Sequence, residues 1–109
     1  MDTISVLYVT FPDEETAKTI GKKLLDLKLI ACINILPIQS LYLWQNVMEE
    51  GNEMIGLLKT RRDLVSNCIE TITQLHPYTT PCILNLSVEA NKSFFDWVNE
   101  VTTPLPNIG

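Results

Sequence analysis

Residues 38–45 read Ile-Gln-Ser-Leu-Tyr-Leu-Trp-Gln, and this run decides the fold that the sequence predicts. Ile38, Tyr42 and Trp44 alternate with leucines, so an extended strand here is apolar on both faces. An extended run at residues 29–36 precedes it and is closed by a proline. A turn signal then follows at residues 49–52, and residues 53–60 return as another strand. These segments predict a β-hairpin that is unusually long for so small a domain.

The two apolar faces of this hairpin predict an obligate oligomer. A domain with one helix-covered sheet face buries only one side of such a hairpin, and exposed apolar strand surface of this extent is typical of an interface. The alternative is a hairpin that curls back over its own core. The aromatic residues Tyr42 and Trp44 favour the interface.

The segments that flank the hairpin follow a regular order. Residues 4–10 form a β-rich run with two apolar faces, which predicts a central strand. Asp13 is a suitable N-cap for a helix with an apolar stripe at three- and four-residue steps. Residues 60–63, Thr-Arg-Arg-Asp, have the spacing of a capping box and predict a second helix that runs to Leu75.

A fourth strand is predicted at residues 82–88, and Asn91 is expected to cap a last short helix, with residues 104–106 as an extended tail. The order strand–helix–strand–strand–helix–strand, followed by a helix, predicts an α+β fold. It is the ferredoxin-like βαββαβ sandwich, with a long hairpin and an extra C-terminal helix, in one domain over residues 1–109. Both main helices then cover one side of the sheet, and the uncovered side is a second reason to expect an oligomer.

Composition excludes several classes of protein. The net charge is −5, and no cluster of basic residues is larger than Lys22-Lys23 or Arg61-Arg62, which argues against nucleic acid as a partner. No apolar run is long enough to span a bilayer, and no secretory signal is visible at the N-terminus. Three cysteines without CxxC spacing fit reduced thiols. We therefore expect a cytoplasmic protein without a membrane partner.

The corner between the second helix and the fourth strand is the first candidate for chemistry. Residues 75–82 read Leu-His-Pro-Tyr-Thr-Thr-Pro-Cys and contain the only histidine of the chain. Pro77 and Pro81 disfavour helical angles at the residues before them, so this corner is extended. The imidazole of His76 is a good ligand for Cu(II) or Zn(II). The alternative is that it bonds the last carbonyl groups of the helix.

Several motifs together resemble the CutA divalent-cation tolerance family, across roughly residues 4–101. They are Val-Thr-Phe-Pro-Asp-Glu at 9–14, Ala-Cys-Ile-Asn-Ile at 31–35, Tyr-Leu-Trp at 42–44, Lys-Thr-Arg at 59–61, Leu-His-Pro-Tyr at 75–78 with Pro81, and Val-Glu-Ala at 88–90. The resemblance implies a ferredoxin-like homotrimer whose long hairpins pair across subunits and which binds divalent cations such as copper, without an agreed reaction. We therefore expect a non-enzymatic protein that acts in divalent-cation tolerance.

The resemblance also implies a set of metal ligands, which this sequence keeps only in part. Some members of the family carry a cysteine at the position of Val9 and a second histidine at that of Leu75, and this chain has neither. His76 therefore remains, with Cys82 and Cys32 as candidate soft ligands. The alternative places Cys82 in the core, because it shares an apolar strand face with the leucine two residues on.

A cleft between subunits is the second implied site. The family is similar in fold to PII signalling proteins, so the alternative function is a regulatory trimer that binds a small effector in such a cleft. The residues that the resemblance places there are Tyr42, Trp44, Lys59, Tyr78 and Glu89. Each has a plainer reading: the aromatic residues as interface anchors, Lys59 as a guard of an edge strand, and Glu89 as half of a surface ion pair.

Overall fold

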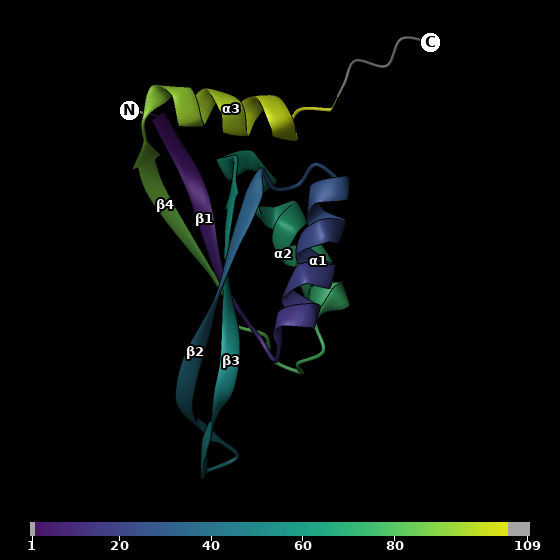
Figure 1. The fold of residues 1–109 in the computed structure, drawn as a ribbon, viewed down its shortest axis with the longest axis vertical. Coiled ribbons are helices and arrows are strands. Elements are labelled where there is room, and N and C mark those ends of the chain that lie inside the picture. The colour runs from purple at the N-terminus through teal and green to yellow at the C-terminus, as the bar shows by residue number, and fades with distance from the viewer. Residues whose placement is uncertain (1, 105–109) are drawn as a thin grey trace.

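The computed structural model of the chain describes residues 2–104. Its elements follow in the order β1 (Asp2–Phe11), α1 (Glu14–Asp26), β2 (Cys32–Trp44), β3 (Val47–Thr60), the single 3-10 turn η1 (Arg62–Leu64), α2 (Val65–Leu75), β4 (Ile83–Ala90) and α3 (Lys92–Thr102). Figure 1 shows the hairpin of β2 and β3 extending well beyond the helices. No helix in the described part of the chain has the length and apolar character needed to cross a bilayer. The expected tail at Leu105 and Pro106 lies outside the described residues.

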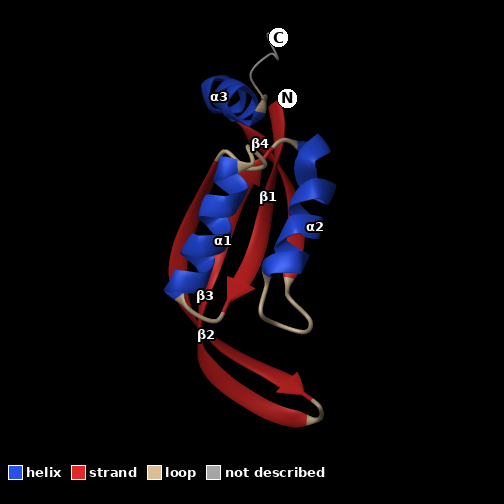
Figure 2. Cartoon of the chain, turned by 90° about the vertical axis from the view of Figure 1, so that its right-hand side faces the viewer, coloured by secondary structure: helices blue, strands red, loops and turns tan. Residues whose placement is uncertain are grey.

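The four strands form one antiparallel sheet in the order β2-β3-β1-β4. Helices α1 and α2 lie side by side over the same face of this sheet (Figure 2). The predicted fold class, a ferredoxin-like sandwich with a long hairpin and a third helix, is therefore confirmed, as is the central position of β1. We call the sheet face opposite α1 and α2 the open face.

The main core lies between the sheet and the two helices. Leu7, Val9 and Phe11 of β1 point into it and are fully buried, as the alternation of side chains along a strand requires. The helices contribute their apolar stripes, led by Leu24 of α1 and Ile72 of α2. These positions are the ones that helical and strand periodicity predict.

The start of α1 follows its sequence signal. The Asp13 carboxylate accepts a hydrogen bond from the Thr16 N–H at 2.7 Å, which makes Asp13 a functional N-cap and lowers the pKa of its carboxyl group. The helix ends at Asp26, and Lys28 adopts a left-handed conformation with φ 58°. The chain thereby turns sharply from α1 toward β2.

Pro37 does not close a strand, contrary to the prediction. β2 runs without interruption from Cys32 to Trp44, and Pro37 pairs with Met54 inside it. The reason is the position of β2 at the edge of the sheet, where a residue without an N–H costs no hydrogen bond on the side that faces away from β3.

The hairpin turn was also predicted in the wrong place. It lies at Gln45 and Asn46, with φ values of 51° and 65°, rather than at residues 49–52. Two consecutive residues with positive φ are the signature of a type I′ turn, whose twist matches that of the flanking strands. The tip beyond the helices is apolar and exposed, with 70% of Leu41, 73% of Leu43 and 75% of Met48 accessible.

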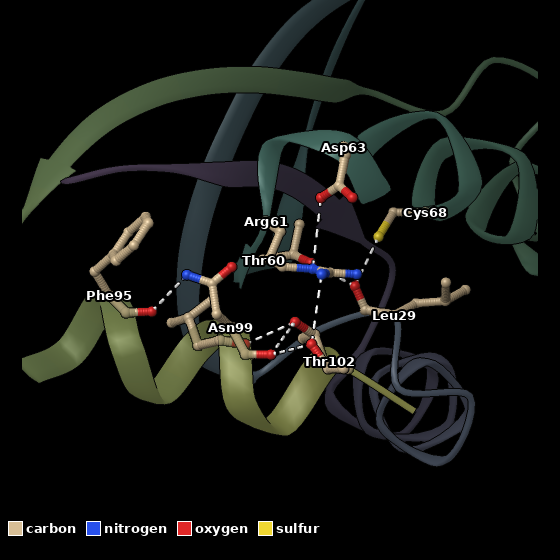
Figure 3. Close-up of polar contacts among 10 residues, drawn as sticks. Leu29, Thr60, Arg61, Asp63, Cys68, Phe95, Asn99 and Thr102 are labelled. Atoms are coloured by element: carbon tan, nitrogen blue, oxygen red, sulfur yellow. Dashed lines mark hydrogen bonds and ion pairs between the residues drawn. The ribbon is translucent and has the colours of Figure 1, made fainter. Parts of the chain in front are cut away.

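The junction between β3 and α2 has a different polar network from the one expected. Thr60 does not cap the helix, because its hydroxyl donates to the Leu29 carbonyl at 2.6 Å, and no side chain caps η1 or α2. Cys68, a core residue as predicted, donates to the same carbonyl at 3.2 Å. Figure 3 shows both groups converging on Leu29, with the Arg61 guanidinium group beside them. The loop after α1 is thereby held to α2.

Helix α3 closes one end of the sheet. Its Val98 forms a second apolar cluster with Ile4 of β1 and Ala31. The Arg61 guanidinium group donates a hydrogen bond of 3.4 Å to the hydroxyl of Thr103, just after the helix. Asn91 precedes the helix, but its side chain bonds Ser93 instead of a backbone N–H. The rest of the open face is left without a helix.

The open face carries the apolar residues of β4. Leu84 is 51% exposed, Leu86 48% and Val88 36%, and together they form one continuous apolar face of β4. Cys82 shares this face and is half-buried, so the expectation that it belongs to the core is wrong. Sequence alternation identifies which residues share a face, and the helix positions decide which face becomes the core.

Candidate functional site

The corner after α2 holds His76 in a fixed position. Pro77 ends the helix, and His76 has extended angles of φ −74° and ψ 135°. Its Nε2 lies 2.8 Å from the Thr10 carbonyl oxygen, and its Nδ1 accepts a hydrogen bond from the Tyr78 N–H at 3.1 Å. The ring is 8% exposed and stacks on Phe11, with centroids 5.3 Å apart. The two partners define a neutral imidazole that carries its proton on Nε2.

This geometry bears on the expected metal ligands. Both ring nitrogens of His76 are engaged by backbone groups, so neither lone pair faces an ion. The alternative predicted that the ring would bond the last carbonyl groups of its own helix. It bonds the Thr10 carbonyl of β1 instead. His76 therefore anchors the 77–82 loop to β1.

The other two candidate ligands lie apart. Cys32 lies across from Lys59, and Lys59 lies across from Val6 of β1. Val6 is four residues, or roughly 13 Å along the strand, from Thr10, the residue that His76 contacts. Burial raises the pKa of the Cys32 thiol, against the opposing charge of Lys59. Within residues 2–104, no three His, Cys, Asp or Glu side chains form a group that could hold a metal ion. A metal site made of His76, Cys82 and Cys32 stays a prediction.

A groove of about 790 Å³ lies between the hairpin, the end of β1 and the 77–82 loop. We call it the tyrosine groove, because all three tyrosines of the chain line it. Its walls include Tyr8, Tyr42, Trp44, Tyr78, Glu49 and Glu53. Cys82 and Thr10 also line it. Figure 2 shows the bend of the hairpin that places its far half beside the loop.

One strong contact joins the loop to the hairpin. The Tyr78 hydroxyl donates to Glu53 Oε2 at 2.6 Å, and the Tyr78 ring packs against His76 with centroids 4.8 Å apart. Burial, followed by the hydrogen bond to Glu53 and the charges of Glu53 and Asp13, raises the pKa of the Tyr78 phenol well above its usual range. Tyr78 is therefore a neutral hydrogen-bond donor at physiological pH.

The predicted cleft residues separate into two groups. Tyr42, Trp44 and Tyr78 all line the tyrosine groove. Lys59 lies elsewhere on the open face, where its ammonium contacts the Asn34 side chain, and Glu89 pairs with Thr3 near the start of β1. A single pocket made of Lys59, Tyr78 and Glu89 is therefore not present in the described chain.

The plainer reading of Lys59 fails, whereas that of Glu89 stays a prediction. β3 is an inner strand, so Lys59 cannot guard an edge. Glu89 forms no ion pair within residues 2–104.

Sequence reasoning missed Glu49 and Glu53. The misplaced turn put Glu49 in a loop and hid its pairing with Tyr42 across the hairpin. With the turn at Gln45 and Asn46, alternation along the returning strand places both glutamates on the face that carries Tyr42. An asparagine at the tip of two apolar runs was the signal that could have located the turn.

Comparison with known proteins identifies a family for this chain. A family model described as the CutA1 divalent ion tolerance protein matches residues 5–101. The divalent-cation tolerance protein CutA of Archaeoglobus fulgidus is 39% identical over 95 residues, which covers 86% of this chain and 93% of the relative. That of Pyrococcus horikoshii is 40% identical over 98 residues, with 89% and 96% covered.

Solved structures agree. The periplasmic divalent cation tolerance protein CutA from A. fulgidus has a TM-score of 0.89 at 37% identity and covers 92% of this chain and 99% of its own. The divalent ion tolerance protein CutA1 from Ehrlichia chaffeensis has a TM-score of 0.89 at 42% identity, with 93% and 96% covered. The family model spans most of β1 through nearly all of α3. The chain therefore belongs to the CutA1 divalent ion tolerance family.

Proposed function

We propose that this chain acts in divalent-cation tolerance as a non-enzymatic homotrimer that binds a divalent cation, such as copper, in clefts between its subunits. Membership of the CutA1 family supports the role in cation tolerance. The family is named for a tolerance and not for a reaction. Histidine is the side chain that most often serves as a general base in enzymes. In the described chain both ring nitrogens of His76 are engaged by backbone groups, which supports a non-enzymatic role.

The observation that carries the oligomer is the open face of the sheet. Leu36, Leu84 and Leu86 are each between 42% and 51% exposed, and the hairpin tip adds residues that are exposed to a greater extent. Contiguous apolar surface of this kind marks an interaction site in a soluble protein. Copies of the chain that pair their open faces and hairpins would bury it, and the number three comes from the family resemblance.

A cation site would need donors from more than one copy. In a single chain, the metal-binding groups that line the tyrosine groove are the Cys82 thiol and the carboxylates of Glu49 and Glu53, and they do not converge on one point. A soft thiol suits copper or zinc, and carboxylates suit harder ions. In this proposal the approach of a second copy completes the coordination, and His76 acts indirectly by fixing the loop that carries Cys82.

Sedimentation of the purified protein at micromolar concentration tests the assembly. We expect a trimer for the natural sequence and dissociation for Leu86→Glu, because a charge on the open face opposes its burial. Asn85→Glu is the matched control, since Asn85 is exposed and lies on the opposite face of β4. A compact single subunit for the natural sequence would remove the oligomer from the proposal.

Calorimetric titration with Cu(II) and Zn(II) tests the cation site. Cys82→Ser should weaken binding, whereas Glu50→Gln, on the outer face of the hairpin, should not. Binding that is absent, or that is unchanged by Cys82→Ser, would contradict this part of the proposal. The cytoplasmic location stays a prediction.

A further inference from the structure

Another groove lies on the helix-covered side of the molecule, between α1 and the end of α2, and has a volume of about 420 Å³. We call it the helix groove. The residues that line it are Thr19, Ile20, Lys22, Lys23 and Asp26 of α1 and Leu75 of α2. Helices α1 and α2 cover the sheet face opposite the open face (Figure 2). Copies of the chain that pair their open faces, as proposed above, leave this opposite side accessible.

The helix groove contains two lysines without a partner of opposite charge. Lys22 and Lys23 are exposed and form no ion pair within the described residues. Four of the eight lysines and arginines of the chain lie in residues 18–28, although the whole chain has a net charge of −5. The carboxylate of Asp26 is the single opposing charge among the lining residues. The groove is therefore a local basic site on an acidic protein, and charge complementarity favours an acidic ligand.

The helix groove also contains apolar side chains. Ile20 is 3% exposed, whereas Leu75, the last residue of α2, is 45% exposed. A ligand in the groove therefore meets apolar surface and two ammonium groups together. An apolar side chain that projects from a peptide fits such a hollow, as anchor residues do at protein interfaces. The flat surface of a bilayer fits it less well.

We infer that the helix groove binds an acidic segment of another protein, which places one apolar side chain against Ile20 and Leu75 and carboxylates at Lys22 and Lys23. The inference goes beyond the proposed function, because it names a protein partner and uses the other side of the sheet. It requires neither the oligomer nor a cation, so its test is independent of the sedimentation and titration experiments described above.

Fluorescence anisotropy of a rhodamine-labelled peptide, titrated with the full-length protein, tests the inference. The peptide consists of glutamates around a single central leucine, and we expect it to bind saturably. Glycine in place of the leucine should weaken binding by about tenfold, because the apolar contact is lost. Lysines in place of the glutamates should weaken it by about tenfold or more, because like charges then face each other.

Substitutions in the protein locate the site. Lys22→Gln and Lys23→Gln should each weaken binding by about threefold, the weight of one exposed ion pair, and Lys92→Gln on α3 is the matched control outside the groove. Leu75→Ala should weaken binding by about fivefold. Leu25→Ala is its control, since Leu25 is 39% exposed on α1 but does not line the groove. Every substituted side chain is exposed, so each variant should fold.

Three results would overturn the inference. The first is the absence of saturable binding of the acidic peptide. The second is an equal loss of binding in the groove variants and in their controls, Lys92→Gln and Leu25→Ala. The third is binding to vesicles of phosphatidylcholine and phosphatidylserine in equal parts without binding to the peptide, because the partner would then be a lipid surface.

Discussion

Replacing His76 with alanine should destabilise the protein in the complete absence of metal. The imidazole ring joins three parts of the chain: it donates to the Thr10 carbonyl of β1, accepts from the Tyr78 N–H in the loop, and stacks on Phe11. The substitution removes all three contacts together. The Tyr78 side chain also loses its packing partner, which loosens its bond to Glu53.

The size of the effect follows from those contacts. Each backbone group left without a partner in a partly buried position costs about 1 kcal/mol, the lower end of the range for unsatisfied groups. Loss of the buried ring against two aromatic neighbours costs about 1 to 2 kcal/mol more. We therefore expect His76→Ala to lower the free energy of unfolding by about 3 to 4 kcal/mol.

Urea denaturation in the presence of a chelator measures this change, at one fixed protein concentration because the stability of an oligomer depends on it. Two further variants divide the effect. His76→Asn can keep an acceptor near the position of Nδ1, and His76→Gln can keep a donor near that of Nε2, so each should recover part of the loss. Gln74→Ala is the control, since Gln74 is exposed in α2, two residues before His76.

A metal-free His76→Ala protein within about 0.5 kcal/mol of the natural sequence would refute this reasoning, because that is the change expected at an unremarkable surface position. Such a result, together with a loss of copper binding, would mean that the ring is free to act as a ligand.

Three further predictions follow from packing and titration. Gly56→Ala should lower the free energy of unfolding by about 1 to 3 kcal/mol in urea melts, because its Cβ would lie 2.8 Å from an aromatic carbon of β1; Gly51→Ala, with open space at that position, should be neutral, and equal effects would contradict the packing. The pKa of Asp13 is lowered, so its contribution to stability is present above its ordinary pKa of 3.8 and is lost as the pH falls through the lower folded value. In thermal melts below pH 3.8, Asp13→Asn should therefore lose stability less steeply than the natural sequence. Burial raises the pKa of Cys68 to about 11, so at pH 8 iodoacetamide should modify Cys82 in the native protein and reach Cys68 only after denaturation; mass spectrometry of digests that finds the reverse order would refute this.

The sequence alone determined the elements, their order and the fold class. These properties depend on local patterns: the alternation that predicts β1, the three- and four-residue steps of the helices, and a capping carboxylate such as Asp13, whose partner lies three residues away. The long hairpin with two apolar faces was also a local pattern, and its tip is exposed in the folded chain.

Only the tertiary structure decided which face of each strand is covered, where the hairpin turns, and what the side chains of the corner contact. Cys82 and its apolar neighbours share a face by alternation, but their exposure depends on helices that pack on the other side. From sequence, Pro37 predicts the end of a strand. Its place inside β2 is possible because β2 is an edge strand, which only the sheet order reveals. The two partners of His76 include a carbonyl 66 residues away in the sequence, and such a contact is set by strand register and packing, which no local spacing encodes.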